Sequence, residues 1–549
     1  MKETGDHDLL IRNCLIVDGS GDAPFTGEVA VSQGRIAAVG PNLGTTARTL
    51  IDSPGSVVCP GFIDSHTHDD LYLLFRPQGP AKVRQGVTTV VIGHCGFSAA
   101  PGVPEHWQEL YDKLGLLGAA HLADGRLGPM QLSGFLDRLD KTGPGINIAS
   151  LVGHSTIRLA VMGSINRPAT SEETDRMRRL VRQAMSQGAF GMSTGLIYPP
   201  GSYAETSELV SLARETARSN GLYSTHLRSE GDEVETALRE ALEIGKKAGV
   251  KVLISHHKVG GRPNWGRSRN TLEMIEDARS QGVDVVADQY LYTASSTFLA
   301  ATLPPGVQEG GAGFYCSKLR DPVFRSEVKH RIEDQTEPAW ENLIMSLGFG
   351  GIVVASSPSR PECAGLSIAE LAELDRAEPL DVLLDLLISD QGSTGAIYHS
   401  MNEDDVIRIM TRPYVMIGSD GIPAFTDRDK VHPRFFGTFP RVLGRYVRQK
   451  RILTLEEAVR KMTSLTAEVF GLKTKGLIRP GMDADLVVFD PEKIIDQATL
   501  SDPAKEPKGI QKVIVGGQVA VERGQVTGRG RGRVLRSGSD QGVPRVNGR

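Results

Sequence analysis

The feature that most constrains the fold is a unit of about thirty residues that recurs between positions 59 and 470. Each unit holds an amphipathic helix, a glycine that ends it, an apolar strand and a polar residue after the strand. One example is the capping box of Thr170 and Glu173, which opens a helix that stops at Gly188, before a strand over 190–193. This alternation is typical of βα units with a parallel sheet, and places the chain in the α/β class.

Candidate strands of this repeat lie at 57–66, 88–95, 147–154, 189–195, 223–227, 251–257, 284–290 and 414–420. Eight strands favour a closed (β/α)8 TIM-type barrel over an open sheet, so we expect a catalytic barrel over 59–474. Residues 352–355 and 396–398 also have strand patterns, so the count of eight is not unique.

The segments outside this repeat have other patterns. Residues 1–58 and 475–527 contain short strands and glycine turns, and we expect them to form one small β domain. About 120 residues separate the last two strands, too many for a simple crossover, so we expect an inserted, lid-like subdomain over 295–365. The glycine-rich basic tail, 528–549, is predicted to be disordered.

Composition narrows the class of protein. Net charge is −4, from 62 basic and 66 acidic residues, so we expect neither nucleic acid nor a membrane as a partner. The first residues are polar and lack the apolar run of a secretory signal. Five scattered cysteines indicate a reducing compartment. These features predict a cytoplasmic enzyme with a small-molecule substrate, and leave its oligomeric state open.

One strand end carries two histidines, in the stretch Gly61-Phe-Ile-Asp-Ser-His-Thr-His68. Residues two apart in a strand point to the same face, so His66, His68 and Asp64 would share one side. Taken alone, the pair fits a metal clamp and a surface loop equally well. The other strand ends decide between these interpretations.

Four further strands end in residues that bind metals or move protons. They are Cys95 after strand two, His226 after strand five, His256 after strand six and Asp420 after strand eight. The C-terminal rim of such barrels carries the active site. Four imidazoles and one thiolate suit zinc, which lowers the pKa of a bound water to about 7. Asp420 would then accept the proton of that water, which predicts metal-assisted hydrolysis.

Over nearly its whole length the chain resembles the amidohydrolase superfamily, and within it the N-acyl-D-amino-acid deacylases. The resemblance rests on motifs at the strand ends and in the loops that follow them. These motifs are Pro60-Gly-Phe-Ile-Asp-Ser-His-Thr-His68, Gly93-His-Cys-Gly96, Gly191-Met-Ser-Thr-Gly-Leu-Ile-Tyr-Pro-Pro-Gly201, Thr225-His-Leu-Arg228, Ile254-Ser-His-His-Lys258, Tyr290-Leu-Tyr-Thr-Ala-Ser-Ser296, Ile417-Gly-Ser-Asp-Gly421 and His432-Pro-Arg-Phe-Phe-Gly-Thr-Phe-Pro-Arg441.

The resemblance implies a (β/α)8 barrel with a small β domain built from both termini. It implies that Cys95, His226 and His256 hold one tight zinc ion. His66 and His68, sharing Cys95, would form a second and weaker site. Related hydantoinases and dihydroorotases carry a carboxylated lysine on strand four, whereas 190–195 contains no lysine. Cys95 would supply the bridging ligand instead.

The resemblance also implies roles around the substrate. Asp420 matches the catalytic aspartate. Lys258 lies two positions after His256 and shares its strand face, Tyr290 ends strand seven, and Arg434 follows strand eight. A lysine, a tyrosine hydroxyl and an arginine together suit one α-carboxylate. His94 and His257 are expected to point away from the ligands, in structural roles.

The expected reaction is zinc-dependent hydrolysis of an N-acyl-D-amino acid with a neutral, apolar side chain. Residues 290–305 contain no arginine or lysine to pair with an acidic side chain, and an unpaired buried charge is costly. Phe298, Leu299 and Leu303 offer apolar surface there, or form the core of the insert. Two alternatives remain: an amidohydrolase of cyclic amides or D-dipeptides, and a metal-free barrel scaffold.

Overall fold

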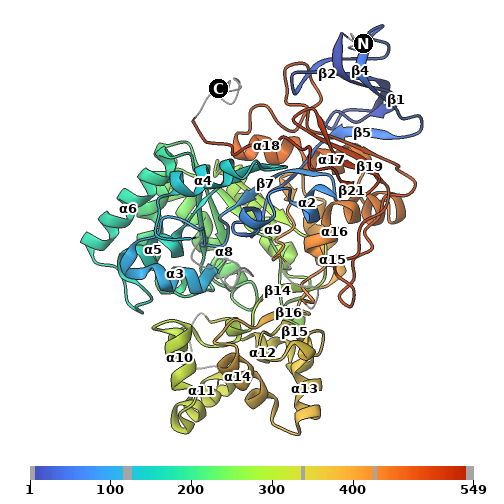
Figure 1. The fold of residues 1–549 in the computed structure, drawn as a ribbon. Coiled ribbons are helices and arrows are strands. Elements are labelled where there is room, and N and C mark those ends of the chain that lie inside the picture. Colours follow the sequence, from blue (N-terminus) through green and yellow to red (C-terminus); the bar gives the residue numbers. More distant parts are fainter. Residues whose placement is uncertain (1–5, 115–126, 335–339, 424–428, 539–549) are drawn as a thin grey trace.

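The protein is described by a computed structural model over residues 6–114, 127–334, 340–423 and 429–538. Figure 1 shows a central body of strands and helices between two smaller parts. One is a helical lobe drawn in yellow and brown, and the other is a sheet that contains both blue and red strands, from the two ends of the chain.

Parallel strands form the centre of the body. They are β6 (Phe62–Asp64), β7 (Val87–Ile92), β8 (Asn147–Ser150), β9 (Val152–Gly153), β10 (Gly191–Gly195), β11 (Leu222–His226), β12 (Lys251–Ile254), β13 (Val285–Gln289) and β17 (Val415–Ile417). Six of them pair in the order β17-β13-β12-β11-β10-β9, and β6-β7-β8 form a second sheet. The strands are almost wholly buried, as expected for parallel strands covered on both faces.

The two parallel sheets meet at both of their edges. β8 and β9 are one strand interrupted at Leu151, whose N–H donates to the carbonyl of Ile92 at 2.9 Å. At the other edge, the N–H of Asp420 donates to the carbonyl of His66 at 2.8 Å. The two sheets therefore form one continuous series of neighbouring strands, in which β17, the last in sequence, is followed by a segment that bonds to the segment after β6, the first. This arrangement gathers the carboxyl ends of the strands around one mouth.

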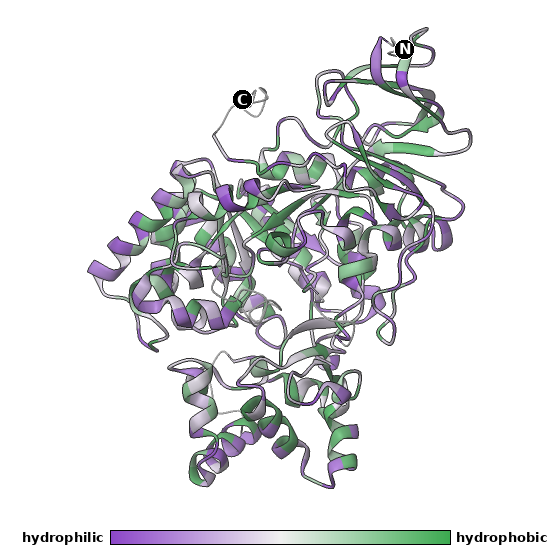
Figure 2. Ribbon diagram, in the orientation of Figure 1, coloured by the Kyte–Doolittle hydropathy of each residue, from purple (hydrophilic) through white to green (hydrophobic). Residues whose placement is uncertain are grey.

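Amphipathic helices surround these strands: α6 (Ser171–Ser186), α7 (Thr206–Arg218), α8 (Val234–Ala248), α9 (Ser268–Ser280), α15 (Glu403–Met410) and α17 (Leu455–Met462). The predicted capping box of Thr170 and Glu173 is confirmed at the start of α6, which buries Met177, Val181 and Ala184. Figure 2 shows α6 as a largely hydrophilic ribbon at the edge of the body. No helix within the described ranges is long and apolar enough to cross a membrane.

Both chain ends contribute to one nine-stranded sheet. Its strands are β1 (His7–Ile16), β2 (Phe25–Ser32), β3 (Arg35–Gly40), β4 (Ala47–Asp52), β5 (Val57–Pro60), β18 (Leu486–Phe489), β19 (Ile510–Val515), β20 (Gln518–Glu522) and β21 (Gln525–Val526). The single strand predicted at 57–66 is wrong, because β5 pairs with β1 and β18 while β6 pairs with β7. The break is at Gly61, where a Cβ atom would lie 2.1 Å from the Thr88 hydroxyl oxygen.

The insert is larger than predicted. β14 (Ser295–Phe298), β15 (Ile352–Ser356) and β16 (Gly395–Tyr398) form an antiparallel sheet of their own, with β16 between the other two. The helices of the lobe are α10 (Ala312–Lys318), α11 (Pro322–Asp334), α12 (Leu343–Leu347), α13 (Ile368–Asp375) and α14 (Pro379–Ser389). The predicted end at residue 365 is therefore too early, because the chain returns to the body only after β16.

The tail also differs from its prediction as far as residue 538. The N–H of Leu535 donates to the carbonyl of Ile148 at 2.7 Å, and the Leu535 side chain is buried. Gly532 packs so closely that a Cβ atom would lie 2.1 Å from the carbonyl oxygen of Ile146. Residues 528–538 are thus ordered against the amino end of β8, and 539–549 lie outside the described residues.

Candidate functional site

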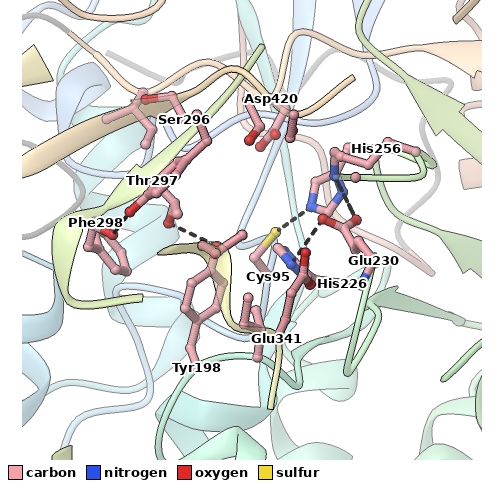
Figure 3. A pocket seen from close by; sticks show the side chains of 18 of the residues that line it. Cys95, Tyr198, His226, Glu230, His256, Ser296, Thr297, Phe298, Glu341 and Asp420 are labelled. Carbon is pink, nitrogen blue, oxygen red and sulfur yellow. Dashed lines mark hydrogen bonds and ion pairs between the residues drawn. The ribbon is translucent and has the colours of Figure 1, made fainter. Parts of the chain in front are cut away.

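The predicted metal ligands lie at the carboxyl ends of the parallel strands, around one cavity. Its lining includes His68, Cys95, His226, His256 and Asp420, while His66 lies behind them and is fully buried. Figure 3 shows the Cys95 sulfur at the centre of this cavity, below Asp420 and beside His256.

The ligand atoms form two overlapping groups. One ligand atom from each of His66, Cys95, His256 and Asp420 lies within 4.8 Å of the others. The Cys95 sulfur is 3.3 Å from Nε2 of His66 and 3.3 Å from Nε2 of His256. The second group contains His226, Glu230 and His256.

His256 belongs to both groups and so connects them. His68 belongs to neither group but contacts Asp420, with Nε2 and Oδ1 3.2 Å apart. The buried ring nitrogens of His226 make no hydrogen bond, and Nε2 lies 3.5 Å from Oε2 of Glu230.

The donor set fits a divalent metal. Burial lowers the pKa of His66 to about 3 and lowers the pKa values of His226 and His256 well below their ordinary value. These imidazoles are therefore neutral, the form that binds metals. Burial raises the pKa of the Cys95 thiol well above its ordinary value, so a nearby cation is required to hold it as a thiolate. Thiolate and neutral imidazole are the ligands that zinc prefers.

Strained backbone aims three of these side chains at the cavity. Cys95, His256 and Asp420 have φ angles of 50°, 36° and 49°, in the left-handed region that residues other than glycine rarely adopt. Such conformations cost about 1–3 kcal/mol each and tend to occur at functional sites. All three lie in the short segments that follow β7, β12 and β17, where the chain turns over the mouth.

The end of β10 holds the loop of Cys95 in place. A Cβ atom on Gly195 would lie 2.2 Å from the Cys95 carbonyl oxygen, so a side chain is excluded there. The Ser193 hydroxyl donates to the carbonyl of Gly93 and accepts from the N–H of Gly96. The Gly-x-Ser-x-Gly pattern at 191–195 is therefore a clamp rather than a nucleophile elbow, because Ser193 is buried and already bonded.

Asp420 is held between basic groups. Its Oδ2 lies 2.8 Å from Nη1 of Arg434, and its Oδ1 lies near the Nε2 atoms of His68 and His66, at 3.2 and 3.6 Å. Burial pushes the pKa of Asp420 upward, but Arg434 together with the nearby His256, His68 and His66 outweighs burial and holds that pKa well below its usual value. Asp420 is therefore an ionised carboxylate in the cavity, able to accept a proton.

The three predicted substrate residues gather beside Asp420. The ring centroid of Tyr290 lies near two cations, 5.6 Å from the Lys258 ammonium and 4.4 Å from the Arg434 guanidinium. Lys258 and Tyr290 line the cavity, whereas Arg434 is almost fully buried behind it. In this structure Lys258 is bound to Glu230, with Nζ and Oε1 2.6 Å apart.

Two carboxylates absent from the sequence prediction support the histidines. Asp288 Oδ2 lies 3.4 Å from Nδ1 of His66, and Glu230 Oε1 lies 3.1 Å from Nδ1 of His256. In both rings the other nitrogen, Nε2, faces the Cys95 sulfur. A carboxylate beside the far nitrogen of a metal-binding imidazole favours the tautomer that carries its proton there, although Nδ1 of His66 makes no hydrogen bond in this structure. A sequence signal existed for Asp288, an acidic residue within a buried apolar strand.

The remaining expectations have mixed outcomes. His94 does not point away from the ligands, since its ring stacks on that of His66 with centroids 3.9 Å apart. His257 is buried and bonded to Thr271, 3.0 Å away. Phe298 lines the cavity, whereas the buried Leu299 and Leu303 are not among its lining residues.

Comparisons with known proteins find relatives over nearly the whole chain. Residues 49–521 match the sequence model of the amidohydrolase family. The chain is 40% identical over 531 residues to D-aminoacylase from Alcaligenes xylosoxydans xylosoxydans, covering 96% of this chain and 97% of that protein. It is 38% identical over 531 residues to N-acyl-D-glutamate deacylase of the same organism, covering 96% of each.

A solved structure is also similar. It is N-acyl-D-glutamate deacylase from Bordetella bronchiseptica, complexed with zinc and a phosphonate inhibitor that mimics the tetrahedral intermediate of the reaction. The TM-score is 0.81 and the identity 38%, covering 96% of this chain and 99% of that one.

The Asp288→Asn variant tests whether the Asp288 carboxylate supports His66 as a metal ligand. The amide keeps the size of the side chain but lacks the charge that favours an Nδ1–H tautomer, so we expect metal affinity to fall about 10–100-fold. Competition with a chromophoric zinc chelator measures that affinity directly. Asp390→Asn, at a buried aspartate of the insert that accepts from Thr394, is the matched control. Equal affinity in both variants would contradict the role of Asp288.

Proposed function

The chain belongs to the amidohydrolase family, and from that premise we propose how its residues carry out the reaction. The protein is a metal-dependent enzyme that hydrolyses N-acyl-D-amino acids to a carboxylate and a free D-amino acid. The observation that carries this assignment is the meeting of Cys95, His256 and an ionised Asp420 within one buried group.

The architecture that we infer is a (β/α)8 barrel, with a β domain from both chain ends and an insert beside the mouth. Support comes from the strand pairing, which returns from β17 to the segment after β6 through the bridge of Thr67 and Gly421. The insert also contributes cavity lining, including Phe298, Leu343 and Tyr398. A barrel explains why residues from five different strand ends face one another.

We assign the tight metal to Cys95, His226 and His256, and a weaker second site to His66 and His68 with Cys95 shared. The zinc complex of the Bordetella bronchiseptica relative supports zinc as the metal. When bound, zinc would lower the pKa of a coordinated water and polarise the amide carbonyl. The absence of any hydrogen bond to the buried ring nitrogens of His226, and the raised pKa of the Cys95 thiol, support this assignment.

Protein groups move the proton and hold the substrate. Asp420 accepts a proton from water and then delivers it to the leaving amine. Lys258, Tyr290 and Arg434 bind the α-carboxylate of the substrate. When a metal is bound at Nε2 of His256, Nδ1 of the same ring would carry the proton and donate a hydrogen bond to Glu230. Lys258, which lies 2.7 Å from that Nδ1 atom here, must then turn away and becomes available to the substrate.

The side-chain pocket favours neutral, apolar groups. Its walls include Phe97, Ile197, Tyr198, Phe298 and Leu343. Such walls stabilise an apolar side chain by removing its surface from water, at roughly 25 cal/mol per Å². A charged side chain gains nothing from them and loses its hydration.

Cys95→Ala tests the metal assignment. In Cys95→Ala we expect most of the tightly bound zinc to be lost, because two neutral imidazoles alone bind zinc weakly. In His68→Ala we expect a larger loss of activity than of tightly bound zinc. Metal analysis after dialysis measures both. Cys316→Ala, at another buried cysteine, is the control. Full zinc content and activity in Cys95→Ala would refute the assignment.

Asp420→Asn tests the proton acceptor. The amide keeps the shape of the side chain but cannot accept a proton, so kcat should fall about 10²–10⁴-fold while zinc is retained. Steady-state kinetics together with metal analysis separates the two effects. A near-normal kcat would show that Asp420 only shapes the turn.

A screen of N-acetyl amino acids for release of free amine tests the function itself. N-acetyl-D-Leu, D-Met or D-Phe should exceed N-acetyl-D-Asp and D-Glu in kcat/KM at least roughly tenfold, about 1.4 kcal/mol. L-enantiomers should be poor, because inversion at the α-carbon separates the carboxylate from its clamp when the carbonyl is in place. Preferred turnover of N-acetyl-D-Glu, or of any L-substrate, contradicts the proposal.

A further inference from the structure

A carboxylate from the insert reaches the substrate cavity. Glu341 lies just before α12, in the lobe, yet it lines the same cavity as Cys95 and His226. Figure 3 shows its side chain opposite Asp420, with Tyr198 on one side and Glu230 on the other. No part of the reaction derived above uses this residue.

The barrel loops are shaped to receive this side chain. The N–H of Glu230 donates to Glu341 Oε2 at 2.9 Å. A Cβ atom on Gly231 would lie 3.1 Å from Glu341 Oε1, and one on Gly260 would lie 3.6 Å from it. Glycines in the loops after β11 and β12 therefore leave room for the carboxylate. Its position is built into the fold rather than being one rotamer of an exposed chain.

The charges around the cavity are unequal. Glu230, Glu341 and Asp420 line it, and Lys258 is the only arginine or lysine among its described lining residues. The ammonium of Lys258 is bound to Glu230, and the nearby Arg434 is bound to Asp420. In the proposed reaction both cations serve the α-carboxylate of the substrate. A second carboxylate, on the substrate side chain, would meet Glu230 and Glu341 without a cation to balance them.

We propose that Glu341 determines specificity by excluding acidic substrate side chains and admitting neutral and cationic ones. This inference rests on the proposed deacylase function. Glu341 does not touch the reacting atoms, so it selects the substrate rather than taking part in catalysis. The apolar walls explain why neutral side chains bind, and Glu341 adds the reason why acidic ones do not.

The matched pair N-acetyl-D-Gln and N-acetyl-D-Glu tests this, because the two differ in charge and hardly in size. In the wild-type enzyme we expect kcat/KM for D-Gln to exceed that for D-Glu at least roughly tenfold. Glu341→Gln should bring this ratio to within about threefold of unity. It should also lower kcat/KM for N-acetyl-D-Lys. The assay is run at pH 8.5, because burial and the charge of Glu230 raise the pKa of Glu341 to about 7.

Two further variants separate charge from packing. Glu341→Asp keeps the charge and should keep the wild-type ratio, and Glu362→Gln, at an exposed glutamate of the insert, should leave it unchanged. Glu341→Gln retains an oxygen that can accept from the N–H of Glu230, so its fold should persist. If it fails to fold, Glu341→Ser removes the same charge with a smaller side chain.

The outcomes are distinct. The inference is overturned if the wild-type ratio of kcat/KM for D-Gln to that for D-Glu is near one. It is also overturned if a folded variant that lacks the charge keeps the wild-type ratio. In either case, turnover of N-acetyl-D-Gln leaves the proposed function intact. An equal loss for all three substrates in Glu341→Gln also overturns it, since that result indicates packing alone. If the wild-type enzyme hydrolyses no N-acyl-D-amino acid, the proposed function fails and the inference fails with it.

Discussion

The site depends on one buried sulfur atom placed between two imidazoles. Cys95 lies 3.3 Å from Nε2 of both His66 and His256, in a region from which water is nearly excluded. Burial alone would keep this thiol protonated and both rings neutral. A divalent cation beside these groups favours the deprotonated thiolate form of Cys95, and the two imidazole rings stay neutral. The donor set therefore fits a divalent metal.

The surrounding scaffold fixes that sulfur from several sides. Ser193 and Gly195 of β10 hold its loop, while Asp288 bonds the backbone N–H of His256 and faces the ring of His66. Beneath the mouth, the fully buried Lys82 donates to Asp64 and Ser419, and so joins the strand of His66 to that of Asp420. Ion pairs of this kind are costly to bury, but removing one partner is costlier still. We interpret them as the means by which the left-handed conformations of the site residues are maintained.

Much of the site could be predicted from the sequence, because it depends on which residues follow each strand along the chain. Strands with polar ends recur at a regular spacing, and parallel strands bring such ends to one edge. His66, Cys95 and His256 could therefore be placed together without any knowledge of packing. The two overlapping groups could not be predicted, because Glu230 and Asp420 join them through side-chain orientations across the mouth.

The expectations that failed depend on contacts between distant segments. Nothing near Gly61 indicates that the chain passes there from one sheet to another. Nothing near Tyr398 shows that its strand pairs within the insert. Leu535 follows a basic, glycine-rich stretch, and its burial is decided by an edge of β8 almost four hundred residues earlier. Glu341 was missed for the same reason, since its role comes from glycines in loops far away in the sequence.

The central claim is that a cysteine sulfur, rather than a carboxylate, anchors the metal. Anomalous diffraction at the zinc absorption edge, from crystals of the protein as purified, tests it most directly. We predict a strong peak about 2.3 Å from the Cys95 sulfur and about 2.0–2.1 Å from a nitrogen of His226 and of His256. A metal bound by carboxylates and histidines, with the sulfur well beyond bonding distance, would contradict this account.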